Sequence, residues 1–348
     1  MNPKNTRATF ISWAPFCSRS DSIAAALGAT SHMVYAANWG SRYSTILLKY
    51  LHQSWKTLRL LLREKPRTIF VMTPPVFACF PIWLYAQFWG ARYVIDAHSG
   101  AFLDRRWTPM LFLHRFFSRW AAITIVTNDH LEKMIRSWGA KASIISDLPV
   151  VFPPPAQMTL NGSFRITLVN TFTRDEPLEL FLRAAPALPD VQFYITGSLN
   201  DANKGLLRMK SDNVEFTGFL PSSEYVGLLL ASHAVMSLTT LEHTMQRGAY
   251  EAVYLGKPVL VSGSEFLRKA FYKGAVYVEN SVDGIVSAVR EMKENLPEYQ
   301  RQVASLRVEK LQRWNQTQTA LREWLDANET ALAREPWDLG ETHRTLQQ

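Results

Sequence analysis

Residues 237–262 read SLTTLEHTMQRGAYEAVYLGKPVLVS, which predicts a strand, a loop, a helix and a second strand in turn. The first strand is expected to end at Thr240, and the helix to begin near Thr244, whose hydroxyl suits the N-cap position. Gly256-Lys257-Pro258 then stops the helix before the second strand. A strand, a helix and a strand in succession are typical of a parallel sheet covered by helices.

The same alternation continues on both sides of this stretch. In the first half we expect strands at 8–13, 68–73, 91–98 and 121–128 and helices at 44–64, 76–89 and 115–120. In the second half we expect strands at 164–172, 190–198, 213–220, 233–240, 257–263 and 275–280 and helices at 177–185 and 222–230. Strands rich in Val, Ile and Phe indicate sheets buried on both faces. The fold class is therefore α/β, with two Rossmann-like, doubly wound domains.

Residues 148–164, LPVVFPPPAQMTLNGSF, mark the domain boundary with four prolines and an Asn-Gly turn. We expect one domain over 1–150 and a second over 151–310. We expect a helix at 299–327. We interpret residues 311–348, which include the second half of this helix, as a crossover helix and polar tail. Ligands bind beyond the carboxyl ends of such strands, so two facing domains would share a central cleft.

Composition excludes several classes of protein. The 348 residues are 47% hydrophobic and 20% charged, unlike a disordered chain or a coiled coil. Two cysteines cannot frame a disulfide scaffold or a zinc site, and the N-terminus lacks the pattern of a signal peptide. We therefore expect a cytoplasmic protein.

Charge is distributed unevenly. Residues 1–150 contain 18 Lys or Arg against 7 Asp or Glu, whereas residues 151–348 contain 20 against 23. Within the basic half, the stretch 42–67 alternates Lys and Arg with Leu and Trp, and only Glu64 opposes its charge. Such a helix fits an anionic membrane surface, with the protein peripheral on the inner face of the cell membrane. An ordinary domain helix with a solvated basic face is the alternative. No nucleic-acid recognition signature is present.

The stretch Ile69–Gly90 is long and apolar enough to cross a bilayer. It contains Pro74, Pro75 and Pro81, and its first residues have the pattern of a buried strand. We expect a strand, a turn and a buried helix rather than a membrane span.

The helix expected from Thr244 can bind a ligand at its N-terminus. Its first amides and dipole favour a diphosphate, which Arg247 could help to neutralise. Glu251 lies seven residues after Thr244, about two turns along the same face, and its carboxylate could accept both hydroxyls of a ribose. The pattern predicts a nucleotide site.

EAVYLGKPVLVS (251–262) resembles the GT-B nucleotide-sugar glycosyltransferases, particularly the family-four retaining group. The resemblance implies that Glu251 binds the donor ribose and that Thr244, Met245 and Arg247 approach the donor. That family has an acidic residue eight positions before this glutamate. Here the position is His243, and Glu242 is one residue too early. Either the loop has an extra residue or His243 replaces the acid near the donor sugar.

Two further segments carry the resemblance through the second half. NVEFTGFLPSSEYVGLLLASHAVMSLTT (213–240) is similar to the family's strand, turn, helix and strand. It implies that backbone groups of Gly218, Phe219 and Leu220 contact the nucleobase. In the loop NTFTRDEP (170–177), Arg174 stands where the family places an Arg and a Lys for the diphosphate, and the lysine is missing.

In the first half, VIDAHSGAF (94–102) follows a strand, so its polar residues belong at the carboxyl end of the sheet. The resemblance implies that His98 faces the donor sugar; the alternative is a histidine that only binds a backbone carbonyl. Asp96 could orient His98, or act as the base if configuration is inverted. Ser99 and Gly100 would let the loop approach the sugar.

Two more loops are candidates for ligand contact. The segment 12–24 has none of the glycines common in GT-B enzymes, and Arg19 and Ser20 could replace their contact with phosphate. A solvated loop is the alternative. Trp39 and Arg42 could contact the acceptor.

Together these features predict a glycosyltransferase of hexosyltransferase type, acting in polysaccharide biosynthesis. It would move a sugar from a nucleotide-diphosphate sugar to a lipid-linked or cell-envelope glycan, with retention expected ahead of inversion. No cofactor or metal is expected, because no Asp-x-Asp pair is present to hold one against the diphosphate. The alternatives are an inactive nucleotide- or glycan-binding GT-B protein and a GT-B sugar-nucleotide epimerase.

Overall fold

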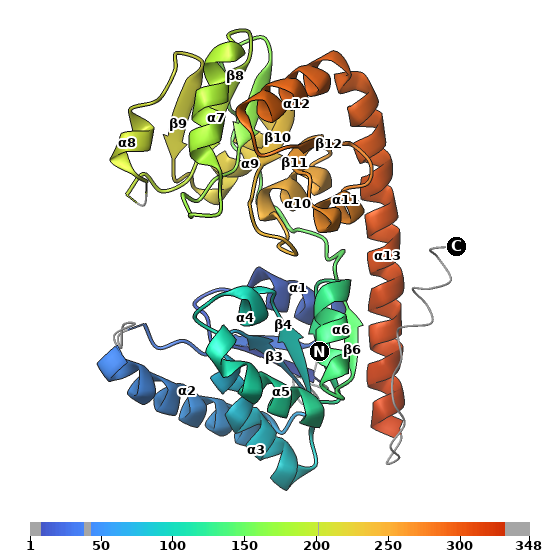
Figure 1. The fold of residues 1–348 in the computed structure, drawn as a ribbon. Helices are drawn as coiled ribbons and strands as arrows, with labels where there is room; N and C mark the ends of the chain where they lie inside the picture. The colour runs from blue at the N-terminus through green and yellow to red at the C-terminus, as the bar shows by residue number, and fades with distance from the viewer. Residues whose placement is uncertain (1–7, 38–42, 201, 331–348) are drawn as a thin grey trace. The chain divides into compact units, whose positions relative to one another are not determined.

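The computed structural model describes residues 8–37, 43–200 and 202–330. The chain divides into two compact units (Figure 1). Unit 1 comprises Met1–Leu148 and Arg313–Gln348, and unit 2 comprises Pro149–Gln312. The long helix α13 (Leu296–Thr330) begins in unit 2 and belongs to unit 1 from Arg313 onward.

The described part of unit 1 contains a six-stranded parallel sheet in the order β2-β1-β3-β4-β5-β6. Its strands are β1 (Ala8–Ser12), β2 (Thr30–Met33), β3 (Thr68–Thr73), β4 (Arg92–Ala97), β5 (Ile123–Val126) and β6 (Ala142–Ile144). Its helices are α1 (Ser18–Leu27), α2 (Tyr43–Glu64), α3 (Cys79–Trp89), α4 (Gly100–Leu103), α5 (Leu111–Trp120) and α6 (Asp129–Ser137), with 3₁₀ turns at Val76–Ala78 and Thr108–Met110.

Alternating residues of this sheet build two cores. Ile69 and Val71 of β3 contact the layer formed by α2, α3, α5 and α6. Phe70, between them, faces α1 and the last part of α13, where Trp314 and Trp324 are buried. Both faces of the sheet are therefore covered, as the apolar strands predict.

The described part of unit 2 contains a second six-stranded parallel sheet, in the order β12-β11-β10-β7-β8-β9. Its strands are β7 (Arg165–Leu168), β8 (Gln192–Thr196), β9 (Val214–Gly218), β10 (Ala234–Ser237), β11 (Val259–Ser262) and β12 (Ala275–Val278). Its helices are α7 (Leu178–Ala184), α8 (Lys204–Leu207), α9 (Ser222–Ala231), α10 (Arg247–Tyr254), α11 (Glu265–Ala270) and α12 (Val282–Glu294), with a 3₁₀ turn at Ala185–Ala187. One face packs on α7 and α12, and the other packs on α9, α10, α11 and the start of α13.

The structure corrects three sequence-based expectations. The edge strands β2 and β6 were not predicted, because four and three residues with polar members carry little strand signal. The helix expected from Thr244 begins at Arg247, with Gln246 at its N-cap position. In the first half, the helix expected at 115–120 already begins at Leu111.

The apolar stretch Ile69–Gly90 forms β3, a turn and α3, as predicted. The expected burial of the helix holds for one side only, because Phe80, Phe88 and Trp89 of α3 are exposed. Within the described residues, no helix combines the length and the apolar character needed to cross a membrane.

Candidate functional site

The strand order places a switch point between β7 and β10 in unit 2. From β7 the chain proceeds through β8 to β9, then returns to the other side of β7 as β10. The loops after β7 and β10, residues 169–177 and 238–246, therefore leave the sheet side by side at its carboxyl edge. Doubly wound sheets bind ligands at such a point.

Asp175 ties these two loops together. Its carbonyl accepts hydrogen bonds from the Thr240 amide at 2.8 Å and the Thr240 hydroxyl at 3.1 Å. Its carboxylate accepts a third, from the Thr239 hydroxyl at 3.0 Å. Asp175 thus fixes the relative position of the loops, a role that its sequence position beside Arg174 does not reveal.

Glu176 folds the first loop on itself. Its carboxylate accepts hydrogen bonds from the amides of Thr171, at 2.8 Å, and Thr173, at 3.0 Å. Both acidic neighbours of Arg174 are therefore engaged with other groups, and Arg174 itself is exposed. Arg174 can meet an anion without first breaking an ion pair to either of them.

The start of α10 lies directly against the end of β7. A Cβ atom built on Gly248 would be 2.5 Å from the Cβ of Val169, so only glycine fits this contact. The Gln246 side chain, just before the helix, accepts a hydrogen bond from the Ser237 hydroxyl at 3.1 Å. The first turn of α10 is thereby held at the switch point, where its amides and dipole favour an anion.

Glu251 lies one turn into α10, and its carboxylate has two partners. Arg247 donates from Nε to Oε1 at 2.6 Å, and the Tyr225 hydroxyl of α9 donates to Oε2 at 2.8 Å. Glu251 is 7% exposed, whereas the Arg247 side chain is 68% exposed. Burial raises the pKa of Tyr225, and the adjacent carboxylate raises it further. The arrangement is a buried carboxylate beside an exposed cation.

The remaining residues of the predicted donor loop lie just before α10. Thr244 does not cap the helix; its hydroxyl donates to the Glu242 carbonyl at 3.4 Å. His243 adopts a left-handed backbone conformation, with φ of 58°. Met245 packs against the apolar cluster under α10, and Glu242 is exposed. The predicted donor contacts of these four residues stay predictions.

The predicted base-contacting turn follows β9. Gly218 has φ of 75°, and its carbonyl accepts a hydrogen bond from the Gly197 amide at 3.2 Å. Phe219 is 81% exposed, and Leu220 is half-buried. Gly197 is itself indispensable, because a Cβ there would lie 2.5 Å from the Asn170 carbonyl oxygen. The turn thus offers an exposed aromatic ring as well as backbone groups.

Lys257 of the Gly-Lys-Pro motif has a structural role. Its Nζ donates to the carbonyls of Leu230, at 2.6 Å, and Ser232, at 2.9 Å, at the end of α9. Burial lowers its pKa, and the positive charge of Arg165 lowers it further. A cation satisfies carbonyls that a helix end leaves unpaired.

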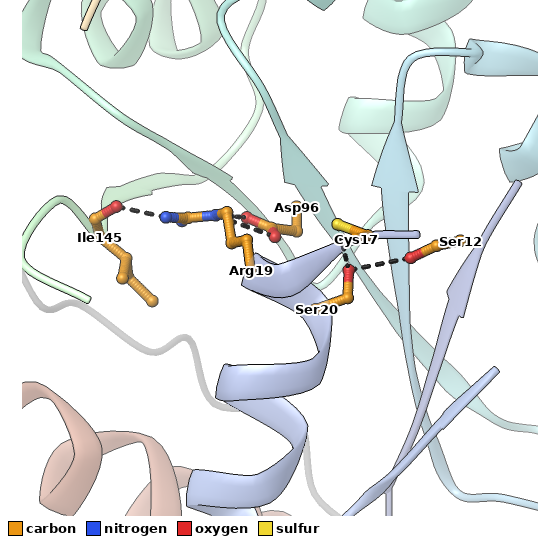
Figure 2. A network of polar contacts seen from close by, with 6 residues as sticks. All are labelled: Ser12, Cys17, Arg19, Ser20, Asp96 and Ile145. Carbon is orange, nitrogen blue, oxygen red and sulfur yellow. Dashed lines mark hydrogen bonds and ion pairs between the residues drawn. The ribbon is translucent and has the colours of Figure 1, made fainter. Parts of the chain in front are cut away.

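In unit 1, Arg19 joins two strand ends (Figure 2). Its Nε donates to both oxygens of Asp96, at 2.9 and 3.0 Å, and its Nη2 donates to the Ile145 carbonyl at 3.0 Å. Asp96 is 1% exposed. The predicted roles, phosphate contact for Arg19 and orienting group or base for Asp96, stay predictions, and each would require this ion pair to rearrange.

Ser20 lies in a second buried chain of contacts (Figure 2). Its hydroxyl accepts a hydrogen bond from Ser12 at 2.9 Å and donates to the Cys17 sulfur at 3.2 Å. The side chain is 1% exposed. A phosphate contact through this hydroxyl would therefore require the start of α1 to open.

His98 follows β4 directly, as predicted, and is half-buried. Its amide donates to the Thr73 carbonyl at 3.0 Å, so the hydrogen bonding between β3 and β4 extends to the backbone of His98. Ser99 and Gly100 form the start of the short helix α4. A Cβ on Gly100 would meet no atom within 4 Å.

Trp39 and Arg42 lie outside the described residues. Among the residues that the structure does describe, no group of three or more His, Cys, Asp or Glu side chains could hold a metal ion. Tyr225, like Asp175, is a residue of this site whose role the sequence did not reveal. It lies 26 residues before Glu251 on an apolar helix, and no local pattern marks it.

Residues 163–295 match the family model described as glycosyl transferases group 1. The match covers most of unit 2, including both switch-point loops and α10. None of the curated proteins matches the sequence.

Solved structures match over almost the whole chain. Sucrose-phosphate synthase from Thermosynechococcus elongatus superposes with a TM-score of 0.71 at 14% identity, covering 93% of this chain and 99% of that one. Anabaena HepE, solved with UDP and glucose, gives 0.68 at 12% identity, covering 94% and 100%. A glycosyltransferase from Rickettsia africae gives 0.67 at 10% identity, covering 93% and 98%. The fold is thus GT-B, as the sequence predicted.

Proposed function

We propose that this protein is a glycosyltransferase whose unit 2 binds a nucleotide-diphosphate sugar. The observation that carries the proposal is the buried carboxylate of Glu251, held by Tyr225 and Arg247 at the switch point of the second sheet. The family match over unit 2 and the likeness to HepE, a protein solved with UDP and glucose, support it.

The described residues suggest a role for each part of the donor. Glu251 accepts the hydroxyls of the ribose. The amides at the start of α10, with Arg247 and Arg174, bind the diphosphate and stabilise the charge that develops as the sugar leaves. The exposed ring of Phe219 stacks on the base, because an aromatic face suits any nucleobase. Arg247 leaves Glu251 for the phosphate when the ribose arrives.

We expect a hexosyltransferase that needs no metal and retains configuration, with a lipid-linked or cell-envelope glycan as acceptor in polysaccharide biosynthesis. Unit 2 offers two exposed arginines for the diphosphate, which supports charge compensation by the protein itself. His98, at the end of β4, stays our candidate for contact with the donor sugar.

Thermal unfolding against UDP, GDP, ADP, dTDP and CMP, each alone and as a sugar conjugate, tests the proposal. A ligand at 100 times its dissociation constant stabilises by about 2.7 kcal/mol, which raises the midpoint by several degrees. We expect one nucleoside diphosphate to stabilise the wild type and to have little effect on Glu251→Gln. No shift with any of these ligands would overturn the nucleotide-sugar proposal.

Glu309→Gln is the matched control. Glu309 also accepts hydrogen bonds from a tyrosine and a cation, Tyr272 and Lys273, but it lies on α13. This variant should keep the full ligand-induced shift. Release of the nucleotide from the sugar conjugate then separates a transferase from a protein that only binds. Formation of epimerised sugar without an acceptor would indicate a sugar-nucleotide epimerase.

A further inference from the structure

Helix α2 exposes apolar side chains that an ordinary amphipathic helix would bury. Its exposed residues include Leu47, Leu48, Leu51, Trp55 and Leu62. With 3.6 residues per turn these five lie on one side of the helix. The contact with the sheet is made instead by neighbours such as Gln53, Thr57 and Leu61, which are buried. A simple helix with an apolar inner face and a solvated basic outer face does not describe α2.

The two helices beside α2 continue this pattern. Helix α3 contacts both α2 and α5, and the three lie side by side on one face of the first sheet (Figure 1). On α3, Phe80, Phe88 and Trp89 are exposed, Phe88 to 73%. Exposed aromatic side chains therefore extend from α2 onto the outward surface of α3.

Helix α5 completes the surface. Phe112, Phe116 and Trp120 are exposed on it, Phe112 to 66%. The rings of Phe116 and Trp83 of α3 are 5.6 Å apart, so the aromatic surface is continuous from one helix to the next. We name the exposed apolar residues of α2, α3 and α5 the aromatic face. It holds 11 of the 21 exposed large apolar side chains in the described part of the chain.

Positive charge accompanies these residues. Between Tyr43 and Ile95 the sequence contains seven Lys or Arg and one acid, Glu64; between Arg105 and Asn128 it contains four Arg and no acid. Arg59, Arg63 and Arg119 are exposed on α2 and α5, and the Arg59 guanidinium lies 5.4 Å from the centre of the Trp55 ring. Glu64 accepts a hydrogen bond from Arg63, and its other oxygen contacts His32.

We propose that the aromatic face docks on an anionic lipid bilayer, with its Trp, Phe and Leu side chains entering the interface and its arginines binding lipid phosphates. Exposed Trp, Phe and Leu beside Arg are the combination that an interfacial surface requires. Cations without apolar side chains would suit nucleic acid as well, whereas exposed leucines contribute nothing to base or phosphate recognition. The proposal concerns unit 1 alone and does not depend on nucleotide binding in unit 2.

Co-sedimentation of the full chain with vesicles tests the proposal, without nucleotide or acceptor. We expect binding to vesicles of 70% phosphatidylcholine and 30% phosphatidylglycerol, weak binding to pure phosphatidylcholine, and loss of binding as salt increases. The triple variant Trp55→Ser, Phe88→Ser and Phe112→Ser should bind about tenfold less. Arg59→Gln, Arg63→Gln and Arg119→Gln together should lower binding to anionic vesicles by about 100-fold.

Matched control variants change the same chemistry in unit 2. Val151→Ser, Leu199→Ser and Val308→Ser remove three exposed apolar side chains, and Lys204→Gln, Arg208→Gln and Lys210→Gln remove three exposed cations. Both should bind vesicles as the wild type does, and circular dichroism checks that every variant is folded. Equal binding to neutral and anionic vesicles would overturn the proposal. So would a stable dimer that the aromatic substitutions dissociate, because the face would then cover a second copy of the chain.

Discussion

The hydroxyl of Tyr225 donates a hydrogen bond to Oε2 of Glu251 at 2.8 Å, joining α9 to α10 across 26 residues of sequence. A buried carboxylate needs such donors to remain charged at an apolar site. Arg247, one turn away, donates to the other oxygen, Oε1. The two bonds together fix the orientation of the carboxylate. A ligand that displaces Arg247 would still find Glu251 oriented by Tyr225.

Tyr225→Phe should therefore weaken nucleotide binding by about tenfold, because one hydrogen bond to a charged group is worth about 1.5 kcal/mol or more. Isothermal titration with the nucleoside diphosphate that stabilises the wild type measures this. Tyr277→Phe is the control, because the Tyr277 hydroxyl donates to the Phe271 carbonyl away from the switch point. Equal affinities for wild type and Tyr225→Phe would remove Tyr225 from the site.

Removal of either exposed arginine should weaken binding of a nucleoside diphosphate more than binding of the monophosphate. We expect Arg247→Gln and Arg174→Gln each to lose about tenfold in diphosphate affinity, since a charge-assisted bond to phosphate is lost. Arg183→Gln serves as control: Arg183 pairs with Glu179 on α7 in the same i,i+4 relation as Arg247 with Glu251. A loss of the same size for the monophosphate would contradict a contact with the second phosphate.

The ion pair of Arg19 and Asp96 should be important for the stability of unit 1. Arg19→Leu leaves a buried carboxylate without its cation, which costs about 3–5 kcal/mol in the free energy of unfolding. Adding Asp96→Asn removes the uncompensated charge and should recover part of that loss. Urea unfolding of the two single variants and the double variant measures the coupling.

The exposed pair of Arg106 and Asp104 provides the comparison in the same unit. Arg106→Leu should cost less than about 1 kcal/mol, as exposed ion pairs usually do. A similar small loss for Arg19→Leu would mean that the Arg19–Asp96 pair is solvated in solution.

His114 should make stability depend on pH. Burial lowers its pKa to about 4, and its ring nitrogens contact the hydroxyls of Thr73 at 3.0 Å and Ser118 at 3.3 Å. The unfolded chain takes up a proton near pH 6.5, whereas the folded protein does so only near pH 4. Below pH 6.5 the unfolded chain therefore binds a proton that the folded protein does not. The contribution of neutral His114 to the free energy of unfolding is complete above pH 6.5 and is lost as the pH falls toward 4, by about 3 kcal/mol in total. Urea unfolding across this range should show a shallower decline for His114→Gln than for the wild type.

Gly248→Ala should destabilise unit 2 even though alanine is the better helix former. The added Cβ would lie 2.5 Å from Val169, so α10 must move from β7. We expect a lower melting temperature and weaker nucleotide binding. Gly100→Ala is the control for stability: its Cβ meets no atom within 4 Å, and the helix propensity of alanine should leave the protein as stable or slightly more stable. A stable Gly248→Ala variant with wild-type affinity would contradict a fixed helix start.

The sequence predicted most strands because their signal is local. The apolar run at 68–73 coincides with β3, and the runs at 91–98 and 257–263 contain β4 and β11. The edge strands β2 and β6 of the first sheet were missed, since they are only four and three residues long and contain polar residues, whereas the longer apolar runs at 213–220 and 275–280 contain the edge strands β9 and β12 of the second sheet. The helix start moved from Thr244 to Arg247 because the capping signal of a threonine is weaker than the packing of Gly248 against Val169.

By itself the sequence determined the alternation of strands and helices, the two α/β halves and the glutamate on α10, because these depend on neighbours in the chain. Only the tertiary structure decided which groups meet Glu251 and which side of α2 points outward. It also decided that the two acids beside Arg174 bind other groups, so that Arg174 stays exposed. The contacts of Glu251 with Tyr225 and of Asp175 with Thr239 join residues that are far apart in sequence, and their geometry depends on how helices and loops pack on a twisted sheet. Periodicity places a residue on one face of a helix, but only packing determines what that face meets.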